Sequence, residues 1–196
     1  MNSAGGGWTL ILNRADGLES FNRSWHDFKL GFGQPTGDHW IGNSWLNELT
    51  TNRDYQLRME IFGWQYEVGF AEYSLFRVHS EIEDYRLELG VYSSFSNASD
   101  CLSQHDDAPF LTYDHGHGLA YDKCIKQYAF GGFWYNWGEK EVHCGRSCFT
   151  CEMGESANAH GKHRNNRLRC NHFPKPGISI NNYTLRKAIL MIKPVG

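Results

Sequence analysis

Alternation of apolar and polar residues in the middle of the chain is the strongest constraint on its fold. Over 55–61 every second residue is apolar and the residues between are polar, which is the period of a strand with one buried face. The alternation recurs over 66–70 and 85–91, and a last strand is expected over 187–192. Consecutive alternating strands joined by short loops predict a twisted antiparallel sheet.

The first fifty residues predict one strand and two short helices. The strand is expected over 9–12. Ser24 can cap a helix that ends at Gly31, and Asn43 or Ser44 can cap a second helix. The second helix is expected to turn three apolar residues inward: Trp45, Leu46 and Leu49. The fold class is therefore α+β, with a long loop-rich second half.

Length and composition fit one domain over residues 1–196. The chain has 12 Phe, 10 Tyr, 7 Trp and 21 Gly, which suits a loop-rich fold with a core built from aromatic rings. A net charge of −3 gives no basis for nucleic-acid binding. No apolar run is long enough for a membrane span. Residues 1–4 do not form a signal peptide and are expected to be a cut end.

Cysteines and glycosylation sequons together predict a secreted glycoprotein. The chain has six cysteines, enough for three disulfides. Asn-x-Ser/Thr sequons begin at Asn22, Asn97 and Asn182. Disulfides persist in oxidising compartments, so we expect an extracellular location.

Three stretches resemble the fibrinogen C-terminal-like domain, the module of fibrinogen chains, ficolins, tenascins and angiopoietins. They are Gly-Gly-Trp-Thr at 6–9 with Asn-Arg-Ala-Asp-Gly at 13–17, His-Trp-Ile-Gly-Asn at 39–43 with Tyr-Gln-Leu-Arg at 55–58, and Phe-Leu-Thr-Tyr-Asp at 110–114 with Gly-Phe-Trp-Tyr-Asn at 132–136. The resemblance implies a single domain with a central antiparallel sheet and a loop-rich binding subdomain, placed at 94–182. It also implies a non-enzymatic recognition role.

The resemblance places a calcium site just before Cys124, where family members have Asp-x-Asp-x-Asp. Here the pattern aligns with residues 114–118, and the two ligand positions are Gly116 and Gly118. Calcium prefers six to eight oxygen ligands, several of them carboxylate. Only Asp114 and Asp122 remain nearby. We therefore predict that the usual calcium site is lost and that the domain holds no cofactor.

Two further sets of residues admit either a metal-binding or a non-metal interpretation. His115 and His117 could bind zinc or copper, or could be exposed loop histidines beside glycines. A zinc knot could be built from five residues: Cys144, Cys148, Cys151, Cys170 and His172. Secretion favours disulfides, so no metal is predicted.

The resemblance also implies one disulfide. In the family the cysteine matched by Cys124 closes a loop with a later cysteine, and the run around Cys148 resembles that partner after an insert. We therefore predict a Cys124–Cys148 bond. The pairing of the other four cysteines stays open: Cys101, Cys144, Cys151 and Cys170.

Two ligand-binding sets are expected in the second half. Ficolin-like members bind acetyl groups beside a tyrosine and a histidine; Tyr128 matches the tyrosine and Phe149 replaces the histidine. Trp134 or Tyr135 could complete an aromatic cleft, although Trp134 could equally be core. A basic set could meet an acidic receptor or a sulfated glycan, or be a solvated loop: Lys162, Arg164, Arg167 and Arg169.

No nucleophile-elbow, zinc-protease or phosphate-binding glycine motif occurs, so no enzyme activity is expected. The leading hypothesis is a secreted domain that binds a protein receptor through its C-terminal loops. Residues 183–194 resemble the ending of angiopoietin-type members. The alternatives are a ficolin-like lectin for acetylated or sulfated glycans in innate immune recognition, and a matrix module without a discrete ligand. Oligomerisation is expected to use segments outside this chain.

Overall fold

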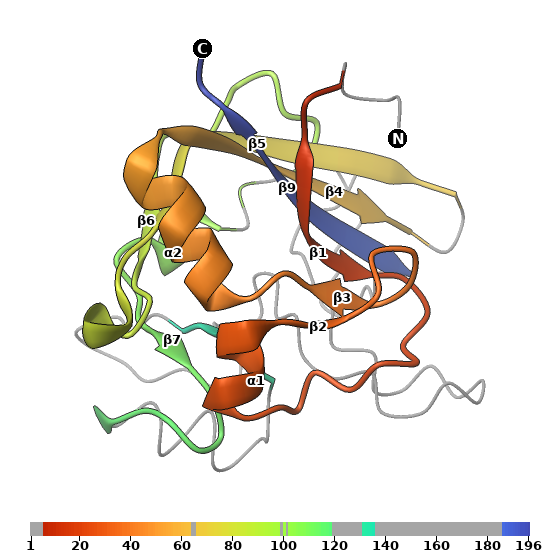
Figure 1. The fold of residues 1–196 in the computed structure, drawn as a ribbon. Coiled ribbons are helices and arrows are strands. Elements are labelled where there is room, and N and C mark those ends of the chain that lie inside the picture. The colour runs from red at the N-terminus through yellow and green to blue at the C-terminus, as the bar shows by residue number, and fades with distance from the viewer. Residues whose placement is uncertain (1–5, 64–65, 99, 101, 119–130, 136–185) are drawn as a thin grey trace.

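The computed structural model describes residues 6–63, 66–98, 100, 102–118, 131–135 and 186–196. Its main feature is a seven-stranded sheet in the order β2-β3-β1-β9-β4-β5-β6 (Figure 1). Every neighbouring pair in it is antiparallel. The strands are β1 (Thr9–Arg14), β2 (Phe32–Gly33), β3 (His39–Trp40), β4 (Tyr55–Phe62), β5 (Val68–Val78), β6 (Leu87–Leu89) and β9 (Lys187–Pro194).

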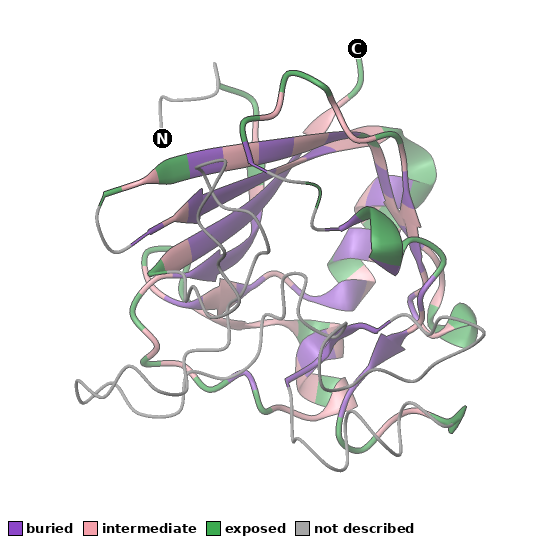
Figure 2. Ribbon diagram, turned by 180° about the vertical axis from the view of Figure 1, so that it is seen from behind, coloured by how far each residue is buried: buried purple, intermediate pink, exposed green. Residues whose placement is uncertain are grey.

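The C-terminal strand lies in the middle of this sheet. Leu190 of β9 pairs with Leu12 on one side and with Met59 on the other, and Met59 pairs with Ala71 of β5. These four side chains are at most 1% exposed, so one row across four strands faces the core. Figure 2 shows buried residues along the inner strands.

The α+β class is confirmed, and so is the alternation predicted over 55–61. The alternation predicted over 66–70 was wrong in phase: Tyr66 and Val68 are 90% and 54% exposed, while Gly69 and Ala71 are buried. The strand itself runs from Val68 to Val78.

Helix α1 (Trp25–Leu30) begins and ends where the sequence predicts. Ser24 Oγ accepts a hydrogen bond from the amide of Asp27 at 3.2 Å, and the Asp27 carboxylate accepts one from the amide of Ser24 at 3.2 Å. This reciprocal pair is a capping box, which satisfies two amides at the start of the helix. Phe28 points into the core, and Gly31 ends the helix.

Removing the Ser24 hydroxyl should destabilise the fold. We expect Ser24→Ala to lower the free energy of unfolding by about 1 kcal/mol, the usual cost of losing an N-cap. The hydrogen bond from Ser24 is the main cause of the lowered pKa of Asp27. A lowered carboxyl pKa stabilises the fold above the unfolded value of 3.8 and loses that effect as pH falls below it. The variant should therefore lose less stability on acidification than the parent.

Urea denaturation at neutral pH and at about pH 3, below the unfolded pKa of Asp, measures both effects. The chain should be made without glycosylation, because Ser24 also completes the Asn22 sequon. Ser94→Ala is the control, since Ser94 is exposed and lies in a turn. Equal losses in the two variants would contradict a capping role.

Helix α2 (Asn43–Asn52) covers the core face of the sheet, and two predictions about it were wrong (Figure 1). Its N-cap is Gly42, with φ of 108°, rather than Asn43 or Ser44. A Cβ on Gly42 would lie 2.8 Å from the carbonyl carbon of Leu30, so close packing against the preceding chain requires glycine. Trp45 is 56% exposed because Leu46 and Leu49 set the inward stripe of the helix, and Trp45 falls outside it.

Below the sheet, the strands β7 (Phe110–Leu111) and β8 (Phe133–Trp134) pair antiparallel. Their aromatic side chains form a cluster with aromatic side chains of α1 and β3. The Trp134 ring lies 5.2 Å from the Phe110 ring and 5.9 Å from the Trp40 ring, and Phe28 lies 5.2 Å from Phe110. The aromatic core is therefore confirmed. Two 3-10 turns, η1 (Glu81–Glu83) and η2 (Ser103–His105), complete the described elements.

Within the described ranges, none of the helices is long and apolar enough to span a membrane.

Candidate functional site

The loop after β7 belongs to the expected binding subdomain, and the structure describes it as far as Gly118. Thr112 and His115 exchange backbone hydrogen bonds of 3.0 and 3.2 Å, which closes a tight turn. Tyr113, within this turn, is 47% exposed. We refer to residues 112–118 as the 112–118 loop.

Asp114 fastens this loop to the first helix. Its Oδ1 accepts a hydrogen bond from the amide of Trp25, the first residue of α1, at 2.8 Å. The same oxygen accepts one from the Thr112 hydroxyl at 2.8 Å. Amides at the start of a helix have no partner within the helix, so this carboxylate satisfies one of them. Asp114, the first residue of the expected calcium pattern, is thus in use as a structural acceptor.

His115 makes a second attachment. Its ring stacks on the ring of Trp25, with centroids 3.8 Å apart and an angle of 24° between the planes. Its Nε2 lies 2.8 Å from Oδ1 of Asp84, which follows η1. The loop is thereby held between α1 and the η1 turn. His115 was expected to bind a metal or to be an exposed loop histidine; its side chain is 39% exposed, and it is also stacked on Trp25 and hydrogen-bonded to Asp84.

Trp25 connects this site to the rest of the scaffold. Its indole Nε1 donates to Glu81 at 3.1 Å, and Glu81 pairs with Lys29 at 2.6 Å. Hydrogen bonds from Lys29 and then from Trp25 lower the pKa of Glu81. The Trp25 ring also lies 5.3 Å from that of Tyr85, whose hydroxyl bonds to Ser44 of α2. The base of the loop therefore rests on a tryptophan that is itself in contact with η1 and, through Tyr85, with α2.

Calcium loss remains a prediction. In the part of the chain that the structure describes, no three His, Cys, Asp or Glu side chains come together as a metal site. We expect millimolar calcium or a chelator to leave the thermal midpoint unchanged. A ligand at 100 times its dissociation constant would add about 2.7 kcal/mol, which would raise the midpoint of a domain this size by several degrees. Differential scanning fluorimetry measures this, with magnesium as the control. A rise specific to calcium would contradict the prediction.

Trp134 and Tyr135, expected in a ligand cleft, are core residues. They are 1% and 4% exposed. The Trp134 indole donates to the carbonyl of Tyr85 at 2.8 Å, and the Tyr135 hydroxyl donates to Gly131 at 2.6 Å. Pairing of β8 with β7 turns the Trp134 ring into the aromatic cluster, and the Tyr135 ring, just after β8, lies 6.1 Å from that of Phe133. The ligand-binding prediction is therefore corrected for both. The core alternative considered for Trp134 is the one that the structure shows.

The remaining predicted site residues fall into two groups. Asn22 and Asn97 are exposed, and their glycosylation stays a prediction. The others lie outside the described residues: Tyr128, Phe149, Lys162, Arg164, Arg167, Arg169, Cys101, Cys124, Cys144, Cys148, Cys151, Cys170 and Asn182.

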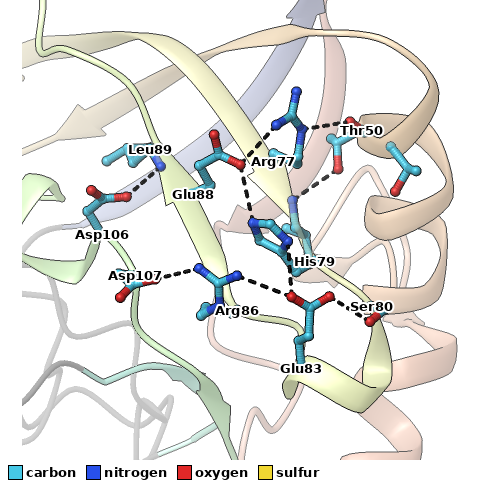
Figure 3. A network of polar contacts seen from close by, with 12 residues as sticks. Thr50, Arg77, His79, Ser80, Glu83, Arg86, Glu88, Leu89, Asp106 and Asp107 are labelled. Atoms are coloured by element: carbon cyan, nitrogen blue, oxygen red, sulfur yellow. Dashed lines mark hydrogen bonds and ion pairs between the residues drawn. The ribbon is translucent and has the colours of Figure 1, made fainter.

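A charged network beside the site was missed by sequence analysis (Figure 3). Arg77 of β5 pairs with Glu88 of β6 at 2.9 Å, and His79 lies between Glu88 and Glu83 at 3.2 and 3.5 Å. Arg86 continues the network to Glu83 at 3.2 Å and to Asp107. Hydrogen bonding, first with Asp107 and then with Glu83, raises the pKa of Arg86. Two arginines face three carboxylates in this network, which favours a role in tying η1 to the sheet edge.

Comparison with known proteins identifies the family. A family profile described as "Fibrinogen beta and gamma chains, C-terminal globular domain" matches residues 1–195. The chain belongs to the fibrinogen C-terminal domain family. The predicted family and the fold class that it implies are therefore confirmed.

Angiopoietins and their relatives are among the similar proteins. Angiopoietin-1 of human and mouse is 32% identical over 195 residues, which is all of this chain and 36% of that protein. Mouse angiopoietin-related protein 7 is 34% identical, with 99% of this chain and 53% of that protein covered. The fibrinogen-like domain thus spans about a third to a half of the length of these relatives.

Solved structures agree with the fold. The fibrinogen-like globe domain of human ANGPTL6 superposes with a TM-score of 0.77 at 32% identity, covering 100% of this chain and 81% of that one. The equivalent domain of human ANGPTL2 has a TM-score of 0.77 at 30% identity, covering 98% and 82%. Lamprey fibrin D-dimer, at 22% identity and a TM-score of 0.72, supports the fold alone.

Proposed function

We propose that this fibrinogen-like domain is an extracellular, non-enzymatic recognition module that binds a protein receptor through the loops of residues 94–182. The observation that carries the proposal is the similarity to angiopoietins over the full chain. Disulfide bonds rather than calcium would stabilise the loops, with Cys124–Cys148 as the first pair. Glycans at the three sequons would accompany secretion.

The geometry of the 112–118 loop supports a binding role. Asp114 and His115 hold its base on α1 and η1, while Tyr113 remains half exposed. Loops positioned by a rigid scaffold are frequent binding elements. Tyrosine suits such a surface because its ring is apolar and its hydroxyl can hydrogen-bond. We infer that Tyr113 lies at the border of the receptor surface.

The basic stretch would supply the charged part of the same surface. Four cations, Lys162, Arg164, Arg167 and Arg169, lie within eight residues of sequence. An acidic receptor face would be attracted to them, and the association rate would fall as salt is raised. Such salt dependence separates this binding mode from purely apolar docking.

A screen of cell-surface receptor ectodomains by surface plasmon resonance tests the proposal. Arg164→Glu should weaken binding to any receptor found by about tenfold or more, since it replaces attraction by repulsion. Arg53→Glu is the matched control, because it makes the same charge change at an exposed residue after α2. Equal affinity of the parent and Arg164→Glu would exclude the basic stretch from the interface.

The lectin alternative predicts a different outcome. Binding of acetylated glycans on an array, abolished by a chelator, would overturn the receptor proposal. Binding of sulfated glycans that is lost with Arg164→Glu and unaffected by a chelator would instead assign the basic stretch to a glycan. Absence of both receptor and glycan binding would favour a matrix module.

A further inference from the structure

A short turn beside the edge of β5 combines an exposed ring with a sequon. Residues 93–96 form the turn, closed by a hydrogen bond of 3.1 Å from the amide of Ser96 to the carbonyl of Ser93. The turn lies in the loop above β5 in Figure 1. Phe95 within it is 87% exposed, and Asn97 just after it is exposed. Ser99 completes the sequon in the sequence.

The backbone of this turn is fixed on both sides. The amide of Ser93 donates to the carbonyl of Glu72 at 2.8 Å, and the amide of Asn97 donates to the carbonyl of Phe70 at 3.1 Å. The Ser96 hydroxyl accepts from the amide of Glu72 at 3.0 Å. These bonds hold the segment along β5, so the positions of Phe95 and Asn97 are defined relative to each other.

The Asn97 side chain is oriented by one of its two polar atoms. Its Oδ1 accepts a hydrogen bond from the amide of Phe70 at 2.7 Å. Its Nδ2 has no hydrogen bond to any residue in the described ranges. N-linked glycosylation uses Nδ2 and leaves Oδ1 as an acceptor. The side chain can therefore carry a sugar without losing its contact with β5.

We propose that Asn97 carries an N-linked glycan and that the exposed ring of Phe95 binds the apolar face of its first N-acetylglucosamine. The inference rests on the secretory route of the proposed function. A solvent-exposed aromatic ring two residues before the asparagine offers an apolar surface, and sugar C–H groups pack against such a face. The glycan would cover a ring that is otherwise 87% exposed.

The covalent step balances without an oxidant. Asn97 Nδ2 forms a bond to C1 of the first sugar of a lipid-linked pyrophosphate oligosaccharide. The bond between C1 and the pyrophosphate oxygen breaks, the lipid pyrophosphate leaves, and the amide loses one proton to solvent.

Asn22 provides an internal comparison. It is also exposed, but the residue two positions before it is Ser20, and its neighbour Phe21 is 1% exposed. A sugar on Asn22 therefore has no exposed ring at the equivalent position. We expect a glycan to stabilise the fold at Asn97 and not at Asn22.

The test expresses residues 1–196 behind a heterologous signal peptide in mammalian cells. Peptide mass spectrometry measures occupancy of each sequon, and an endoglycosidase trims the glycans to one N-acetylglucosamine. We expect Asn97 to be occupied in most molecules. The trimmed chain should melt about 2–4 °C above Ser99→Ala, which removes the sequon but keeps the Asn97 hydrogen bond to Phe70; this is the shift expected for one ring–sugar contact in a domain this size.

Variants of Phe95 decide whether the ring is responsible. Phe95→Leu should abolish the gain in thermal midpoint from the Asn97 sugar, and Phe95→Tyr should retain it. Both should fold, because the side chain is 87% exposed. An unoccupied Asn97 in the parent, or an equal gain with Phe95→Leu, would overturn the proposal. Since the signal peptide imposes secretion and no receptor is used, failure here is separate from failure of the receptor proposal.

Discussion

Replacement of Asp38 by alanine is expected to lower the free energy of unfolding by about 3–5 kcal/mol. Asp38 is 3% exposed, and its carboxylate accepts three backbone amides. The distances are 2.6 Å from Ala15, 3.3 Å from Asp16 and 3.3 Å from Glu19. Arg14, 6% exposed, lies 3.5 Å from the same carboxylate. One side chain thus organises the whole turn after β1.

The size of the effect follows from what stays buried after the change. Arg14 would keep its hydrogen bond to the carbonyl of Glu19 and its place over the Phe21 ring, so the cation would remain in the core without Asp38. Arg14 would stay buried but lose its contact with the Asp38 carboxylate, and removing one partner of a buried ion pair is strongly destabilising. The amides of the turn would also lose their acceptor.

Guanidinium denaturation of three variants checks this expectation. Asp38→Asn keeps the shape and one acceptor oxygen, so its loss should be smaller than that of Asp38→Ala. Asp16→Ala is the control in the same turn, since Asp16 is exposed and accepts from Leu18 at 3.1 Å. Its loss should stay below about 1 kcal/mol. Similar losses for Asp38→Ala and Asp16→Ala would refute an organising role for the buried carboxylate.

The sheet could be predicted from the sequence because its signal is local. Alternation over 55–61 and the apolar run over 187–192 are complete within single strands. The position of β9 between β1 and β4 had no local signal, since it depends on pairing of residues far apart in the chain. The same limit explains Trp45, which was predicted to face inward: the phase of α2 is set by the surface that it covers, and that surface is not visible in the local sequence.

In the candidate site, too, some features had a local sequence signal and others depended on contacts between distant residues. Glycines at 116 and 118 could be recognised from their place in a family pattern. The contact between His115 and Trp25 could not, because ninety positions separate the two residues and only the fold brings them together. The contact of Asp84 with His115 could not be predicted either, because it depends on where η1 lies. Burial of Trp134 was left open because an aromatic run suits a core and a binding cleft alike.

Gly33→Ala is the second change for which we expect a large effect, a loss of about 3 kcal/mol or more. Gly33 has φ of +75°, a conformation that costs an L-residue about 1–2 kcal/mol. A Cβ there would also overlap the carbonyl oxygen of Asp38. That carbonyl accepts a hydrogen bond from the amide of Gln34 at 3.1 Å in the turn between β2 and β3, so relief requires backbone movement. Overpacking of this kind costs about 1–3 kcal/mol further.

Gly6→Ala separates the two contributions, because Gly6 has φ of +74° and no atom of the described residues lies within 4 Å of its Cβ position. Gly6→Ala should therefore lose only the stability that the positive φ costs an L-residue. The β2–β3 turn that Gly33 shapes is also the segment that places Asp38, so the two sites share one backbone. The double variant Gly33→Ala/Asp38→Ala should therefore lose less stability than the sum of the single losses. Simple additivity in guanidinium denaturation would mean that the clash is absorbed without moving the carboxylate, contrary to the geometry of this turn.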